Sequence, residues 1–331
     1  MRVPDPPKQT GDLLAVLTIS LVILVLLGGW LTDRYGAKRI LSIGTLIAAL
    51  LIGFWVRAER ERTRAEAERA RAEAARVQAE SEARAKAQAV GMVWVPAGEF
   101  FVGCNEQVDR DCDAGEKPGR MATVGAFAID KTEVTVSEYR ACVEAGGCSD
   151  ERLGMAFWGG QEMPTWSLYC NWPKSERGNH PINCVEWKQA VAYCRWAGKR
   201  LPAEAEWEKA ARGTDGRKYP WGNAGYGSSG RVANIADEQS SPLHPAWNIP
   251  RGYDDGYLDT APVGSFPAGK SVYGALDMIG NVWEFAADEF AQGYSIRGGS
   301  WNNVARGARA SDRRRVEFAY RSSLIGFRCV R

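Results

Sequence analysis

The chain has 331 residues, including 36 Gly and 13 Trp, with a formal net charge of +2 and a pI of about 8.1. Its length suits one large domain with appendages, or two ordinary domains. The near balance of charge argues against a polyanionic partner such as nucleic acid. Only two histidines are present, His180 and His244, which excludes a multi-histidine metal site.

Two apolar runs near the N-terminus predict a transmembrane hairpin that follows a short tail, residues 1–12. Residues 13–31 and 40–56 are each about long enough to cross roughly 30 Å of hydrocarbon as a helix. The loop between the two runs lies within the segment Gly29–Arg39, whose sequence is GWLTDRYGAKR. This segment is similar to the cytoplasmic loop motif of major facilitator transporters. This resemblance covers the hairpin alone. It implies a cytoplasmic loop and an exported C-terminal domain.

The sequence contains signals for both possible locations of the C-terminal domain, cytoplasmic and extracytoplasmic. Four arginines between residues 57 and 64 outnumber the basic residues of the loop, which favours a cytoplasmic domain. All eight cysteines, however, lie between Cys104 and Cys329, and this pattern favours disulfides in an oxidising compartment. We therefore favour a membrane protein whose C-terminal domain is periplasmic or otherwise extracytoplasmic.

Residues 57–90 predict a helical stalk. They alternate Ala, Glu, Arg and Gln without Gly or Pro, a composition that strongly favours helix. Glu80 and Arg84 stand four residues apart with the acid first, which is the stabilising orientation. Because nearly all apolar residues here are Ala, a solvated spacer of roughly 50 Å is favoured over a coiled coil.

From residue 91 onward the pattern is typical of an α+β, loop-rich domain, 91–331. Residues 92–103 predict a hairpin and residues 122–129 a further strand. The capping box Thr135-x-x-Glu138 predicts a helix that ends at Gly146. A second helix is expected over 185–197. A third is expected from Leu201 to Gly213, with Pro202 in its first turn.

The C-terminal stretch, residues 294–331, contains two strand-like segments with a polar run between them. RGGSW at 297–301 and IGFRCV at 325–330 have the character of strands. The intervening run is rich in Arg, Asn and Ser and has no apolar periodicity, so it predicts a surface segment. Binding residues are often found on such segments.

These motifs resemble the formylglycine-generating enzyme family, also called sulfatase-modifying factor domains, over about residues 91–331. Besides RGGSW and IGFRCVR, the resemblance is carried by MVWVPAG at 92–98, IDKTEVT at 129–135 and KRLPAEAEWEKAARG at 199–213. It implies an irregular fold similar to that of C-type lectins, in which metal ions organise long loops. Long loops are otherwise uncommon in compact domains.

The resemblance implies structural Ca²⁺, a cation that takes carboxylate, amide and backbone oxygens. One group of positions matches a calcium site of the family, and a second pair matches the neighbourhood of another. Alternatively, each Asn and Asp is a turn residue that bonds its own backbone. The candidate ligands are Asn234, Ile235 (carbonyl), Asp255 and Tyr257 (carbonyl) for the first site, and Asn281 and Glu284 for the second.

The pairing of the cysteines does not follow from the sequence, because eight cysteines allow many connectivities. Three local pairs are candidates, and a fourth would join the second helix to the last strand. The fourth pair closes the longest loop. If disulfides stabilise by lowering the conformational entropy of the unfolded chain, this pair contributes most to the stability of the domain. The candidate pairs are Cys104–Cys112, Cys142–Cys148, Cys170–Cys184 and Cys194–Cys329.

Family enzymes oxidise a sulfatase cysteine to formylglycine with copper held by two thiolates in the segment after RGGS. Soft thiolates suit Cu(I). The matching positions in this chain are Asn303 and Ala308, and no cysteine lies between Cys194 and Cys329. Copper-dependent formylglycine formation is therefore not expected.

Other catalytic residue types give weak signals. Non-haem iron relatives need histidines from an additional domain, whereas His180 and His244 lie in loops where a structural role is favoured. Glu204, Glu206 and Glu208 occupy alternate positions of a helix and do not share a face. They are therefore expected to form salt bridges rather than a catalytic pair of carboxylates.

Three functions compete: a non-catalytic recognition module, which we favour, an oxidase that uses another cofactor, and a structural assembly protein. Lectin-like folds displayed by diversity-generating retroelements share RGGSW and IGFR and vary residues in the same interval. The expected partner is a protein or a small anionic ligand bound through the arginines; alternatively, these arginines form a solvated charged face. An oligomer is compatible with the sequence. The candidate ligand-binding residues are Trp301, Asn302, Asn303, Arg306, Arg309, Asp312, Arg313, Tyr320 and Ser322.

Overall fold

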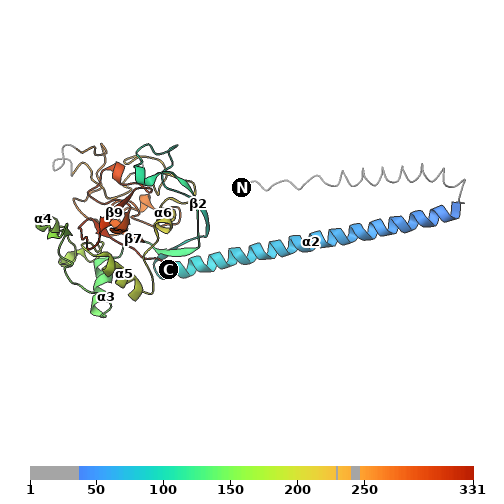
Figure 1. Cartoon of the computed structure of the whole chain (residues 1–331), viewed down its shortest axis with the longest axis horizontal. Helices are drawn as coiled ribbons and strands as arrows, with labels where there is room; N and C mark the ends of the chain where they lie inside the picture. Colours follow the sequence, from blue (N-terminus) through green and yellow to red (C-terminus); the bar gives the residue numbers. More distant parts are fainter. Residues whose placement is uncertain (1–36, 229, 240–246) are drawn as a thin grey trace. The chain divides into compact units, whose positions relative to one another are not determined.

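The computed structural model describes residues 37–228, 230–239 and 247–331 (Figure 1). The chain divides into two units, residues 1–79 and 80–331. The first expected membrane span, 13–31, lies outside the described residues. The second, 40–56, continues without a break into the expected stalk, because both belong to one helix, α2, Ala37–Ala89.

The expectation of a membrane span over 40–56 is not supported. Among the described residues, no helix combines the length and the apolar character that a membrane crossing requires. The remainder of α2 covers the residues expected to be helical, and its residues from 57 to 86 are almost all exposed. Their role as a stalk stays a prediction. The helix ends at Ala89 and is followed by Gly91, whose φ of 71° favours glycine.

Four short strands open the second unit. β1, Met92–Val95, pairs antiparallel with β4, Phe127–Asp130, and β2, Gly98–Val102, pairs antiparallel with β3, Arg120–Val124. The predicted hairpin over residues 92–103 is therefore wrong. β4 is buried along its whole length and gives the mostly buried β1 a matching partner, whereas β3 is more exposed.

The helices follow local capping signals. α3, Val136–Glu144, begins as predicted: the Thr135 hydroxyl accepts the Glu138 N–H at 3.1 Å, and Glu138 accepts the Thr135 N–H at 2.8 Å. α5 spans Trp187–Trp196. α6 spans Glu204–Arg212, so Pro202 precedes the helix instead of lying in its first turn. The start is shifted because the Glu206 carboxylate accepts the N–H of Ala203, at 2.9 Å.

The remaining elements of this domain are short. β5 and β6 form a small antiparallel hairpin, which α4 follows (Figure 1), and the described residues also contain four single-turn 3₁₀ helices. Their bounds are Phe157–Trp158 (β5), Gln161–Glu162 (β6), Pro164–Ser167 (α4), Ala114–Glu116 (η1), Ser175–Arg177 (η2), Pro267–Gly269 (η3) and Ala305–Gly307 (η4).

The largest sheet has four strands in the order β10-β7-β8-β9, with β10 parallel to β7 and the other pairs antiparallel. Its strands are β7, Trp283–Phe290, β8, Gly293–Arg297, β9, Arg313–Glu317, and β10, Ile325–Gly326. β9 lies inside the polar run expected to be a surface segment, and it is a strand that the sequence pattern does not predict. It is an edge strand with charged residues at its exposed positions, so it lacks the apolar alternation of a half-buried strand.

The structure joins all eight cysteines in the four pairs named from the sequence. Cys194 of α5 bonds Cys329 next to β10, and this bond closes a loop of 135 residues. Around it, Tyr139 of α3, Tyr193 of α5 and Phe327 pack ring against ring. The domain is thus an α+β, loop-rich fold held by disulfides and aromatic side chains.

Candidate functional site

The first expected calcium group is brought together by two loops. Both oxygens of Asp255 accept backbone N–H groups, from Ile235 at 2.9 Å and from Tyr257 at 2.9 Å. The amide nitrogen of Asn234 donates to the carbonyl of Asp259, whereas its buried Oδ1 has no hydrogen-bond partner. An unmatched buried amide oxygen is costly, and a cation would satisfy it.

Electrostatics at the same loops also favour a cation. Burial raises the pKa of Asp255 to about 7, and the neighbouring charge of Asp237 adds to this effect. Asp237 accepts the Asp255 N–H at 2.8 Å, so the two carboxylates are held close together. A divalent ion would remove the repulsion and restore the charged form of Asp255. The donors present therefore fit Ca²⁺.

The second expected pair is arranged differently. Glu284 already accepts hydrogen bonds from buried Arg328, at 2.7 Å, and from the Trp207 indole, at 2.8 Å. Its carboxylate is therefore compensated within the chain, which speaks against Glu284 as a simple metal ligand. Asn281 uses its amide to link Asn234 and Glu133.

Glu133, which the sequence analysis did not select, is the unusual group of this second region. It is buried, and one of its carboxylate oxygens lacks a hydrogen-bond partner. Burial and the charge of Asp277 raise the pKa of Glu133 well above its ordinary value. The sequence signal that could have selected Glu133 is its place in the IDKTEVT motif, directly after Lys131 and Thr132.

The positions expected to carry copper thiolates in the family hold side chains with structural roles. Oδ1 of Asn303 accepts hydrogen bonds from the Ser300 N–H, the Ser300 hydroxyl and the Trp283 indole, at 3.0, 2.7 and 2.9 Å. Ala308 is fully buried, and its carbonyl accepts the Tyr226 hydroxyl at 2.8 Å. All eight cysteines are disulfide-bonded, so no free thiol exists to replace the pair.

A shallow hollow of about 340 Å³ opens beside these positions. It is lined by Trp247, Asn248, Asn302, Asn303 and Val304. The wall thus combines amide groups with one indole and carries no charged side chain among these residues. Such a surface can donate to and accept from peptide groups.

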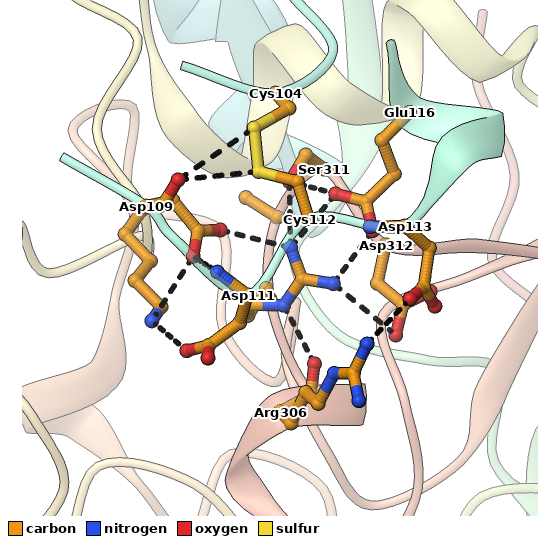
Figure 2. A network of polar contacts seen from close by, with 12 residues as sticks. Cys104, Asp109, Asp111, Cys112, Asp113, Glu116, Arg306, Ser311 and Asp312 are labelled. Carbon is orange, nitrogen blue, oxygen red and sulfur yellow. Dashed lines mark hydrogen bonds and ion pairs between the residues drawn. A yellow bond between two sulfur atoms is a disulfide. The ribbon is translucent and has the colours of Figure 1, made fainter. Parts of the chain in front are cut away.

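Arg309, expected to bind a ligand, is instead buried and bonded to acids of the chain. Two of these acids, Asp109 and Glu116, are labelled in the polar network of Figure 2. Arg309 donates to Glu116 at 2.6 and 2.7 Å and to Asp109 at 2.8 Å. Burial alone would raise the pKa of each carboxyl, but the hydrogen bonds and charge of Arg309 bring both below their ordinary values. Arg309 therefore attaches the Cys104–Cys112 loop to the C-terminal stretch.

The same network contains a group of three acids, of which only Asp113 is partly exposed. Oxygens of Asp113, Glu116 and Asp312 lie within 4.8 Å of one another, as a metal site would require (Figure 2). Burial raises the pKa of Asp312 to about 6. However, Arg306 and Arg314 form ion pairs with Asp113 at 2.8 and 2.9 Å, so cationic side chains already occupy this region.

Four of the nine expected ligand-binding side chains are buried. Trp301 packs against Tyr169, with ring centroids 5.2 Å apart, and Arg309, Asp312 and Ser322 are buried. Arg313 forms an ion pair with Glu204 at 2.7 Å. Arg309 and Arg313 are thus each paired with acids of the chain, and anion binding through the arginines stays a prediction. Asn302, Asn303, Arg306, Arg313 and Tyr320 are at least partly exposed.

The family model of the sulfatase-modifying factor enzyme 1-like domain matches residues 77–331. The chain belongs to this family. The match covers the disulfide-bonded domain, the hollow at Asn302 and Asn303, and the Arg309 network.

Relatives within the sulfatase-modifying factor family include both active and inactive proteins. The chain is 38% identical to the formylglycine-generating enzyme of Thermomonospora curvata, over 60% of this chain and 72% of that protein. It is 34% identical to the inactive C-alpha-formylglycine-generating enzyme 2 of Bos taurus, over 73% of this chain and 88% of that protein. With the mouse formylglycine-generating enzyme the match spans 60% of the relative's length.

Among solved structures, PvdO from Pseudomonas aeruginosa is similar, with a TM-score of 0.54 and 26% identity over 72% of this chain and 93% of that one. Family membership thus accounts for the scaffold. It leaves the chemistry of the site to be argued from the side chains, since the family contains proteins with and without activity.

Proposed function

We propose that this domain is a non-catalytic, extracytoplasmic recognition module that binds a peptide segment at the hollow beside Asn302 and Asn303, on a C-type-lectin-like scaffold. The observation that carries this proposal is the state of the two thiolate positions. Asn303 is a hydrogen-bonded structural residue and Ala308 is buried. Without thiolates, Cu(I) has no soft ligands there.

Two further findings support the proposal. A bovine relative that aligns over 88% of its length bears a name that describes it as inactive. Four disulfides favour an oxidising compartment. Attachment to a membrane through residues 13–31 stays a prediction.

Calcium fits the proposal as a structural ion. Asn234 Oδ1 and the Asp255 carboxylate, with the carbonyls of Ile235 and Tyr257, would hold it. It would supply positive charge between loops that are otherwise acidic. With the ion bound, these residues would hold the loops that precede the four-stranded sheet in one arrangement. Recognition would depend on that arrangement.

The test is an assay for formylglycine. The full chain is incubated with copper, oxygen and a cysteine peptide of sulfatase type, and aldehyde is sought by mass spectrometry. We expect none, and detection of aldehyde would overturn the proposal. A peptide array then measures binding: Asn302→Ala and Asn248→Ala should each weaken the strongest peptides, whereas Arg315→Ala, which lies outside the hollow, should not. Peptide binding that is unchanged in both Asn variants would remove the hollow as the site.

A second candidate, an oxidase with another metal, rests on the carboxylate group of Asp113, Glu116 and Asp312. Elemental analysis of the purified chain separates the two. Stoichiometric iron or copper that is lost in Asp312→Asn would favour the oxidase, and calcium alone would favour recognition.

A further inference from the structure

A second hollow, of about 320 Å³, lies at the side of the four-stranded sheet and shares no lining residue with the one described above. It is formed by the start of α5, the β7–β8 hairpin and the turn that follows β9. Its chemistry is unlike that of the first hollow, because aromatic rings and charged groups line it. The side chains that carry the argument are Glu186, Trp187, Lys188, Glu289, Tyr294 and Phe318.

Three aromatic rings of this hollow form one rigid unit. Trp187 and Tyr294 stack with centroids 4.1 Å apart and planes 3° from parallel. Phe318 packs edge to face against Tyr294, with ring centroids 5.1 Å apart and an interplanar angle of 79°. The Trp187 indole donates to the Ala286 carbonyl at 2.8 Å, which fixes its orientation. Phe318 is 47% exposed, so part of its ring is open to a ligand. Electron-rich ring faces attract cations.

Two carboxylates converge on the same rings. Glu289 is the cross-strand partner of Tyr294 in the β7–β8 pair. Burial raises the pKa of Tyr294, and the charges of Glu289 and Glu186 raise it further, which agrees with both carboxylates lying near its hydroxyl. Glu186 is already bound by Arg321, whose Nε donates at 2.9 Å. Within the described part of the chain, the Glu289 carboxylate accepts no hydrogen bond and forms no ion pair.

The turn after β9 is held in an unfavourable backbone conformation at the rim of this hollow. Ala319 has a φ of 61°, in the left-handed region that residues with a Cβ seldom adopt. Such strain persists only where the surroundings fix it, and it gathers at ligand sites. Here it places Phe318 against Tyr294.

We propose that this hollow binds an alkylated ammonium ion, which would contact the rings of Phe318 and Trp187 and be balanced by Glu289. Rings supply attraction to a weakly hydrated cation, and the carboxylate supplies its counter-charge. Lys188 is the one cation among the lining residues. It is exposed, and its flexible stem lets the ammonium group remain in water. The proposal does not depend on the recognition function of the first hollow.

The test compares choline chloride with 3,3-dimethyl-1-butanol, its neutral isostere, by calorimetric titration against the full chain. We expect saturable choline binding and a dissociation constant for the isostere that is about fivefold higher, since only choline has a charge for the rings and Glu289. Equal binding of the two molecules, or no saturable binding of choline, would overturn the proposal.

Variants then locate the site. Glu289→Gln should weaken choline about fivefold and leave the isostere unchanged, whereas Phe318→Ala should weaken both. Glu144→Gln, a matched change on the exposed end of α3, should alter neither. Phe318 is half exposed, so its variant should unfold at the same temperature as the parent. Choline binding that survives Glu289→Gln and Phe318→Ala would place the ligand elsewhere and contradict the assignment.

Discussion

Two clusters of buried acids in this domain have opposite electrostatics. Around Arg309, the carboxyls of Asp109 and Glu116 have lowered pKa values because a guanidinium group binds both. Around Asp255, the nearest charged neighbours are acids, and its pKa is raised to about 7. Each cluster is buried to a similar degree.

The difference shows how a buried acid is to be interpreted. Where the chain supplies its own cation, as Arg309 does, the acid holds the fold together and has no capacity left for a ligand. Where acids lie together with neutral donors, as at Asp255, the site is prepared for a cation from solution. The position of a carboxylate in a family motif does not distinguish the two cases, but its partners do.

Removing the internal cation is expected to have the largest effect. Arg309→Met leaves Asp109 and Glu116 buried without a counter-charge, so we expect the free energy of unfolding to fall by about 3–5 kcal/mol. Urea denaturation followed by tryptophan fluorescence measures this change. A loss below about 1 kcal/mol would mean that the network is not a buried ion cluster.

Calcium should stabilise the domain, and more strongly at pH 8 than at pH 5. The folded-state pKa of Asp255 lies above its ordinary value of 3.8, so without a cation the folded state loses stability as pH rises from that value through about 7. Calcium binds the charged carboxylate and offsets this loss. At a hundred times its Kd the gain is about 2.7 kcal/mol.

Thermal unfolding at the two pH values, with and without calcium, measures the effect. Asp255→Asn removes the titrating group and should abolish both the calcium shift and its dependence on pH. A calcium shift of equal size in the parent and in Asp255→Asn would place the ion elsewhere.

The smallest effect is expected at the exposed edge of the Arg309 network. Arg306 pairs with Asp113 at 2.8 Å, but its side chain is 64% exposed. Water and salt screen such a pair, so Arg306→Met should change the free energy of unfolding by less than about 1 kcal/mol. Measured beside Arg309→Met in the same urea series, it is the matched control. If both variants lost the same free energy of unfolding, burial of the ion pair would not explain its contribution to stability.

The sequence predicted local features well where a few neighbouring residues decide them. Thr135 and Glu138 form the expected capping box, and α2 ends before Gly91. The three acids of α6 form salt bridges, as expected: Glu204 with Arg313, Glu206 with Arg200, and Glu208 with Arg212.

Predictions failed where distant partners decide the outcome. β1 pairs with β4 and not with β2, because burial selects the partner. The composition of the polar run after RGGSW predicts a surface segment, yet Arg309 and Asp312 are buried. Asp109 and Glu116 compensate the arginine from about 200 residues away. No local pattern shows such a distant charge partner.

By itself, the sequence determined the membership of the sulfatase-modifying factor family, the loss of the two thiolate positions, and a cysteine set confined to one domain. These follow from residue identity alone. Only the tertiary structure decided which acids are compensated, which arginines remain exposed, and where rings and carboxylates enclose a hollow. Those properties depend on distance in space, because charge and burial act between side chains that the chain order keeps apart.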